Sequence, residues 1–155
     1  PGQLDILIHQ LEQYRWSNNG LTEDRWIEAG EFEKDVYKII YSGRDDGLHQ
    51  QGVGMLISTE AKKALLGYDT VGPRIIKARF KTTHGKATVL HVYAPTADCA
   101  DSVIDEFYAL LQQTVNNTSN TDLMVIMGDF NAKVGTDWKT WKGAIGKFGH
   151  GKKMN

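Results

Sequence analysis

The sequence predicts one α/β domain, a layered sandwich of helices and sheets in which strands run in mixed directions. Two observations carry this prediction. The segments follow one another as helix, strand, strand, short helix, hairpin, helix and buried strand. The chain has 155 residues, of which 41% are hydrophobic and 24% charged, so it can build a core of its own.

The first half of the chain carries one helix pattern and two strand patterns. Residues 3–15 are expected to form a helix whose apolar face consists of Leu4, Leu7, Ile8 and Leu11. The segments 35–42 and 52–58 have the composition of strands. Between them, Arg44-Asp45-Asp46-Gly47 indicates a turn, because aspartate and glycine favour turns.

A short helix and a hairpin are predicted next. Ser58 is expected to cap the helix, since its hydroxyl can accept a hydrogen bond from the first turn, and Gly67 is expected to end it. The segments 74–82 and 87–94 are rich in apolar and β-branched residues. They are joined around His84-Gly85, which is typical of a hairpin of two antiparallel strands.

The last predicted elements are a helix and a strand. Residues 102–115 form an amphipathic pattern with an apolar side made of Ile104, Phe107, Leu111 and Val115. The apolar run Leu123–Met127 is expected to be a central strand, buried on both faces of its sheet. Residues 133–155 have turn composition and no periodicity, so they are expected to form an irregular tail.

Composition excludes some classes of protein and leaves others open. No apolar run approaches the roughly 18–20 residues of a membrane span. Cys99 is the only cysteine, so no disulfide partner is available within the chain. An intracellular protein is therefore expected. The 133–155 tail holds six lysines and one acid, and it could contact phosphates, although a solvated chain end is the simpler explanation.

The residues with the clearest chemical potential follow the apolar run, in Gly128-Asp129-Phe130-Asn131. Polar groups just past the carboxyl end of a buried strand commonly line the site of an α/β protein. If the chain stays extended, Asp129 and Asn131 point the same way, and a carboxylate beside an amide can coordinate a cation or orient a water. Alternatively, the two residues form an Asx turn that only caps the strand.

Three segments in this order resemble motifs of the endonuclease/exonuclease/phosphatase family: Leu21-Thr22-Glu23-Asp24-Arg25-Trp26, Tyr93-Ala94-Pro95-Thr96 and Gly128-Asp129-Phe130-Asn131. Other segments extend the resemblance over the whole chain, to the endonuclease domain of RTE-type non-long-terminal-repeat retrotransposons. These segments are Gly43–Gly47, Gly52–Gly54, Glu60–Ala64 and Asp105–Tyr108. The vertebrate craniofacial development protein 2 group resembles a host relative of that domain.

The resemblance implies a DNase I-like sandwich that nicks DNA with Mg²⁺, or with Mn²⁺ as the alternative metal, in the nucleus. By the motif match, Glu23 would hold the metal and Asp129 would activate or orient the attacking water. Asn131 would position that water or the phosphate, and Tyr93 would hydrogen-bond the phosphate. Arg25 would contact the DNA backbone, although a surface ion pair explains it equally well. Trp26 is expected to be a packing residue.

Two motifs of the family have no counterpart in the sequence. An Asn at the end of the first strand would lie before residue 1, and a Ser-Asp-His triplet would lie beyond Asn155. We therefore expect an incomplete domain, with a second half that lacks strands and with little or no activity as this chain. The polar residues Ser17-Asn18-Asn19 are also unfavourable in the strand that precedes Glu23. We therefore expect either a short strand that begins near Gly20 or a degenerate copy of the domain.

Two other functions stay open. The same metal centre would serve a phosphomonoesterase that acts on a lipid or a nucleotide. A non-catalytic remnant or host-adopted protein would instead bind a partner or nucleic acid through the retained face. The sequence leaves the oligomeric state open.

Overall fold

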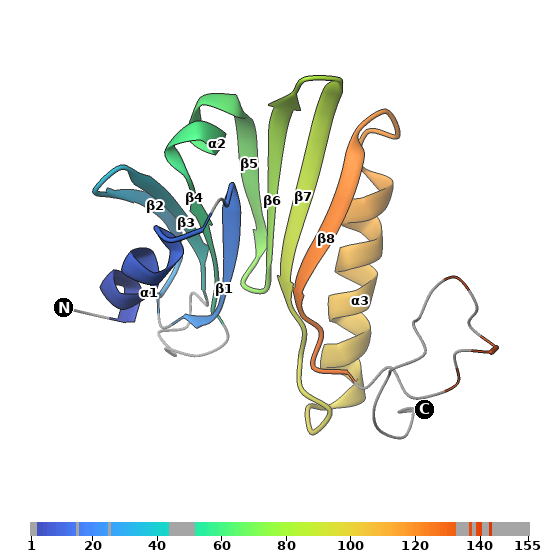
Figure 1. The fold of residues 1–155 in the computed structure, drawn as a ribbon. Helices are drawn as coiled ribbons and strands as arrows, with labels where there is room; N and C mark the ends of the chain where they lie inside the picture. The colour runs from blue at the N-terminus through green and yellow to red at the C-terminus, as the bar shows by residue number, and fades with distance from the viewer. Residues whose placement is uncertain are drawn as a thin grey trace.

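The computed structural model describes residues 3–14, 16–24, 26–43 and 52–132, together with 137, 139, 140 and 143. The turn expected at 44–47, Arg25 and most of the 133–155 tail lie outside these residues. Two four-stranded sheets pack face to face, with a helix on each outer side (Figure 1). The layered α/β sandwich expected from the sequence is thereby confirmed. None of the described helices is long and apolar enough to span a membrane.

The first sheet is antiparallel throughout. Its strands, in spatial order, are β1 (Asn18–Asp24), β4 (Gly52–Ile57), β3 (Tyr37–Ser42) and β2 (Ala29–Lys34). Helix α1 (Gln3–Leu11) covers its outer face, where Ile8 packs against Ile39 and Leu56. The predicted packing role of Trp26 is confirmed, because its ring contacts the rings of Phe32 and Tyr41 beside this cluster.

The second sheet contains both strand directions. Its strands, in spatial order, are β5 (Leu65–Gly72), β6 (Ile75–Thr82), β7 (Gly85–Tyr93) and β8 (Leu123–Asp129). The first three are antiparallel, and the predicted hairpin is the β6–β7 pair. Helix α3 (Asp101–Asn116) packs on the outer face and connects β7 to β8, which therefore runs parallel to β7 (Figure 1).

The main core lies between the two sheets. Both sheets contribute buried apolar side chains to it: Ile40, Val53, Met55 and Ile57 from the first, and Ile76, Ala78, Phe80, Val89 and Tyr93 from the second. The predicted apolar side of α3 is confirmed, because Phe107 and Leu111 are buried against the outer face of the second sheet. This four-layer packing fixes the relative position of the strand ends.

The prediction of a central, doubly buried strand at Leu123–Met127 is wrong. β8 is an edge strand in the described part of the molecule, with β7 as its neighbour on one side. Leu123 is 67% exposed, and Val125 and Ile126 are 40% and 39% exposed. A continuous apolar run shows that a segment is hydrophobic, but it does not show whether the strand has a neighbouring strand on both sides. The sequence therefore did not distinguish a central strand from an edge strand.

Two further boundaries differ from expectation. Helix α2 (Thr59–Ala64) is capped by Ser58 as predicted, with Ala61 N donating to Ser58 Oγ at 3.2 Å. It ends at Ala64 and not at Gly67, because strand β5 begins directly at Leu65. β1 begins at Asn18, earlier than the expected Gly20. As the edge strand of its sheet it can carry polar residues that a central strand could not.

Candidate functional site at the ends of β7 and β8

The candidate site is built on the parallel pair of strands β7 and β8. Tyr93 and Asp129 are register partners at the ends of these strands, so their side chains project from the same face of the sheet. The pairing continues past the strands, where Ala94 N donates to Asp129 O at 2.8 Å. The structure thus brings together two residues that the motifs singled out.

Gly128 makes this close approach of the two strands possible. Its φ is 140°, which side-chain-bearing residues rarely adopt. A Cβ atom placed on Gly128 would lie 1.9 Å from the carbonyl oxygen of Val92 on β7. Glycine is therefore required before Asp129 for both conformational and steric reasons.

The chain does not stay extended after Asp129. Asn131 has φ of 45°, and its backbone N–H donates to Asp129 Oδ1 at 2.8 Å, which is an Asx turn. The Asn131 side chain crosses to β7, where Nδ2 donates to the carbonyl of Ala94 at 2.7 Å. Of the two alternatives that the sequence left open, the Asx turn is the one that forms, and it redirects Asn131.

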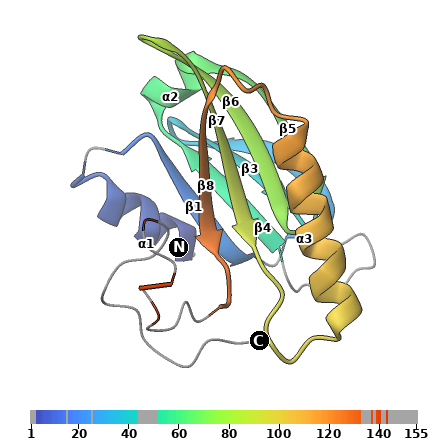
Figure 2. The same ribbon diagram turned by 90° about the vertical axis from the view of Figure 1, so that its right-hand side faces the viewer.

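Strand β1 comes from the other sheet and reaches the same place. β1 and β8 run side by side (Figure 2). A cavity of about 400 Å³ opens between the strands, and its lining contains Gly20, Thr22, His91 and Asp129. Glu23 follows Thr22 in β1, although its side chain lies outside the described structure. The described backbone therefore brings the strand segment that carries Glu23 to the same region as Asp129.

Tyr93 is buried and has a cation beside it. Its ring packs in the core between the sheets, and the guanidinium of Arg74 lies 5.4 Å from the ring centroid. Arg74 Nη1 donates to the Tyr93 carbonyl at 3.2 Å, and Tyr93 N donates to the Arg74 carbonyl at 3.0 Å. No motif in the sequence singles out Arg74, because its contact with Tyr93 depends on how β6 pairs with β7.

His91 lies on the wall of the same cavity. It is 3% exposed, and Nε2 lies 3.1 Å from the carbonyl oxygen of Leu21 in β1. Burial lowers the pKa of His91, and the backbone carbonyls of Leu21 and Met127 oppose that shift by favouring the charged form. One sequence signal could have revealed it, since His91 shares a strand face with Tyr93.

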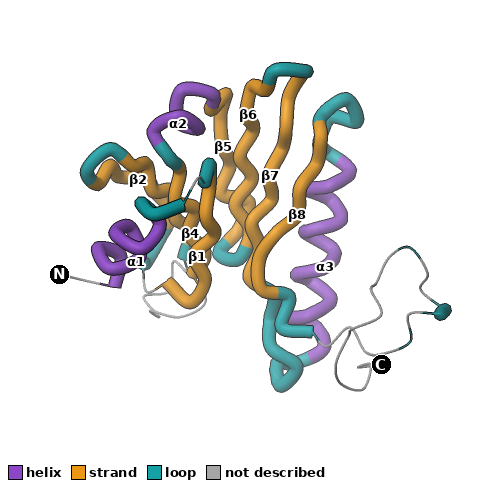
Figure 3. The backbone as a smooth tube through the Cα atoms, viewed as in Figure 1, coloured by secondary structure: helices purple, strands orange, loops and turns teal. Residues whose placement is uncertain are grey.

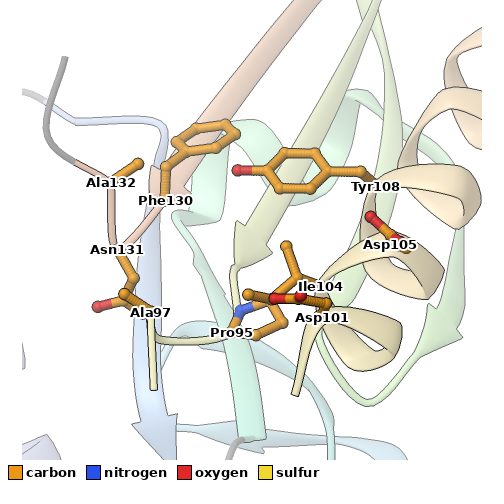
Figure 4. A pocket seen from close by; sticks show the side chains of 9 residues that line it. All are labelled: Pro95, Ala97, Asp101, Ile104, Asp105, Tyr108, Phe130, Asn131 and Ala132. Carbon is orange, nitrogen blue, oxygen red and sulfur yellow. The ribbon is translucent and has the colours of Figure 1, made fainter. Parts of the chain in front are cut away.

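A second cavity, of about 470 Å³, lies beside Asn131 on the α3 side (Figure 4). The connection after β7 and the chain after β8 meet the start of α3 there (Figure 3). The rings of Tyr108 and Phe130 face each other across its rim, and α3 contributes Asp101 and Asp105. Asn131 lines this second cavity, whereas Asp129 lines the cavity on the β1 side.

The donor groups on the β1 side fit Mg²⁺ in kind. The described residues contain no group of three or more His, Cys, Asp or Glu side chains gathered for a metal. Mg²⁺ does not require one, because it commonly takes one or two carboxylates and keeps several waters. Asp129 is exposed, and its Oδ2 takes no part in the hydrogen bond from Asn131 N. Among the described side chains that line this cavity, Asp129 is the carboxylate that could contact such an ion.

Two proteins that share a name are similar in sequence to this chain. No protein-family model matches the sequence. Craniofacial development protein 2 of Bos taurus is 32% identical over 151 residues, which cover 97% of this chain and 25% of that protein. The protein of the same name from Tragulus javanicus is 31% identical over 151 residues, covering 97% and 26%. The chain thus spans about a quarter of the length of these relatives, and the expected similarity to this group is confirmed.

Proposed function

We propose that this chain belongs to a Mg²⁺-dependent endonuclease domain that hydrolyses one phosphodiester bond in DNA. In retrotransposons whose endonuclease domain the sequence resembles, such a nick supplies the 3′ hydroxyl that primes reverse transcription. One observation carries the proposal. The parallel pairing of β7 and β8 brings Tyr93 and Asp129 to one edge of the sandwich, beside β1. A DNA partner and a nuclear location follow from the proposal.

Each residue of the site has a separate proposed role in the hydrolysis. A bound Mg²⁺, held through Glu23, would polarise the phosphate and stabilise the leaving oxygen. The exposed carboxylate of Asp129 can accept a proton from the attacking water or hold that water in line. Asn131, anchored through Nδ2 to Ala94, fixes the turn that presents this carboxylate. By the motif match Tyr93 would hydrogen-bond the phosphate, and Arg74, whose guanidinium lies over the Tyr93 ring, could assist it.

The activity of this chain is expected to be weak. The Asn and the Ser-Asp-His motifs of the family have no counterpart in the 155 residues. Catalytic groups that act as a unit are strongly non-additive, so the lack of one partner can remove most of the rate. Fast, Asp129-dependent nicking would contradict this expectation of weakness and leave the endonuclease assignment in place.

Nicking of supercoiled plasmid tests the proposal. We expect slow conversion to the open circle that requires Mg²⁺ and that Asp129→Ala reduces by at least about a hundredfold, the usual range for a general base. Asp105→Ala is the matched control, because this exposed acid lines the second cavity. Equal losses in the two variants, or nicking that survives Asp129→Ala, would count against the site.

Metal binding and two other substrates separate the alternatives. If the site is as proposed, Mg²⁺ shifts the amide resonances of Thr22 and Asp129, and Asp129→Ala removes the response. Release of phosphate from small monoesters without DNA nicking would point to the phosphomonoesterase. Salt-sensitive DNA binding without any cleavage or Mg²⁺ response would point to the non-catalytic binding protein.

A further inference from the structure

His91 occupies the place where three strands meet. It belongs to β7, its Nε2 approaches the carbonyl of Leu21 in β1, and its register partner in β8 is Met127. Two residues beyond Met127 is Asp129, and two residues beyond Leu21 is Glu23. One imidazole therefore lies between the two strands that carry the candidate carboxylates.

The ring lies directly against the backbone of β1. A Cβ atom placed on Gly20 would lie 1.9 Å from Cε1 of His91 and 2.3 Å from Nδ1. The imidazole thus packs directly on the backbone of Gly20, and any larger residue there would collide with it. His91 consequently acts as a spacer of fixed size between the sheets.

One ring nitrogen of His91, Nδ1, is buried without a hydrogen-bond partner among the described residues, which a residue that served only for packing would not require. The contact of Nε2 with the Leu21 carbonyl is a hydrogen bond in the tautomer that carries the proton on Nε2, because a carbonyl oxygen only accepts. In the neutral ring, Nδ1 is then a bare acceptor, and within the described residues it is buried without a hydrogen-bond partner. The carbonyl of Met127 cannot satisfy it, since it too is an acceptor. An unpaired buried acceptor is costly, and an apolar side chain would avoid that cost.

We propose that His91 is a positioning residue, whose hydrogen bond to the Leu21 carbonyl holds the end of β1 at a set distance from β8 and so aligns the strand ends that carry Glu23 and Asp129. This inference rests on the proposed endonuclease function, because it gives those two carboxylates a common metal. It assigns to His91 no contact with substrate. Its effect is transmitted through the backbones of β1 and β8.

Two substitutions at His91 and one control test the inference in the full chain. His91→Gln keeps an N–H that can reach the Leu21 carbonyl, whereas His91→Phe fills the space without a donor. His84→Gln is the control, because His84 is an exposed histidine in the β6–β7 turn. Mg²⁺ affinity is read from the amide shifts of Thr22 and Asp129. We expect about tenfold or greater loss of affinity in His91→Phe, partial or full retention in His91→Gln, and no change in the control.

The possible results separate the inference from the proposed function. Unchanged Mg²⁺ affinity in a folded His91→Phe, or equal losses in His91→Gln and His91→Phe, overturns the inference. If His91→Phe does not fold, the ¹⁵N resonances of the wild-type ring decide: protonation at Nε2 supports the inference and protonation at Nδ1 overturns it. If the folded wild-type chain shows no Mg²⁺ response, the proposed function fails. The metal-free amide shifts then test positioning alone, since His91→Phe must move both Thr22 and Asp129.

Discussion

Replacing Gly128 by alanine is expected to destabilise the protein strongly, through two separate costs. At φ of 140°, a residue with a side chain is strained by about 1–3 kcal/mol. The new Cβ would also lie 1.9 Å from the Val92 carbonyl oxygen, a backbone atom that cannot rotate away. Forcing β8 away from β7 adds about 1–3 kcal/mol. The total of about 2–6 kcal/mol is a large part of the 5–15 kcal/mol that typically stabilises a domain.

Two other glycines separate these costs. Gly85 has nearly the same φ, 145°, but open space where its Cβ would be, so Gly85→Ala should show the strain alone, about 1–3 kcal/mol. Gly67 has open space and no φ in that range. Gly67→Ala should therefore be neutral or up to about 1 kcal/mol more stable, because alanine restricts the unfolded chain.

Urea denaturation of the three variants and the wild type measures the free energies of unfolding. The expected order of stability is Gly67→Ala, then Gly85→Ala, then Gly128→Ala. A Gly128→Ala variant no less stable than Gly85→Ala would refute the reasoning. It would mean that β8 does not approach β7 as described, and the placement of Asp129 beside Tyr93 would fall with it.

Two further predictions concern hydrogen bonds away from the site. The guanidinium of Arg79, with help from the Thr88 hydroxyl, lowers the pKa of Asp122 to about 2, against about 3.9 in an unfolded chain. The ionised Asp122 carboxylate therefore stabilises the folded protein fully above about pH 4, and this contribution is lost as the pH falls through about 2. Asp122→Asn should lower Tm at pH 7, and the difference in Tm from the wild type should shrink between pH 4 and 2. A difference in Tm that is independent of pH would contradict this. Ser58→Ala removes the cap of α2 and should lower the free energy of unfolding, measured by urea denaturation, by about 0.5–2 kcal/mol. Ser58→Thr keeps a hydroxyl that can accept the hydrogen bond, so it should lower the free energy of unfolding less. Equal losses in the two variants would rule out capping as the cause.

The elements that the sequence predicted well are those with a complete local signal. Helix α3 has a full apolar stripe, and α2 begins at a serine whose hydroxyl caps it. Strands β2 and β5 were not foreseen. β2 alternates Phe32 with exposed glutamates, and β5 contains Asp69 and two glycines. Both lie at sheet edges, where one side of the backbone needs no partner and the composition is correspondingly less apolar.

The candidate site was predictable only where a motif marked it. Asp129, Asn131 and Tyr93 stand in recognisable segments, and the structure places them together. His91 and Arg74 were missed because their surroundings arise from strand pairing. His91 meets Leu21 across 70 residues of sequence, and Arg74 meets Tyr93 across 19. No local pattern encodes contacts at such separations.

β8 has the composition of an interior strand but lies at the edge of its described sheet, and Asp129 is its last residue. None of its seven residues is a lysine or proline, the residues that usually protect edges. With β7 as its one described neighbour, the strand end is secured from that side alone. The Asn131 amide compensates by donating across to the Ala94 carbonyl, while Ala94 N donates back to Asp129 O. Asn131 thus fixes the position of the Asp129 carboxylate, whichever substrate that carboxylate meets.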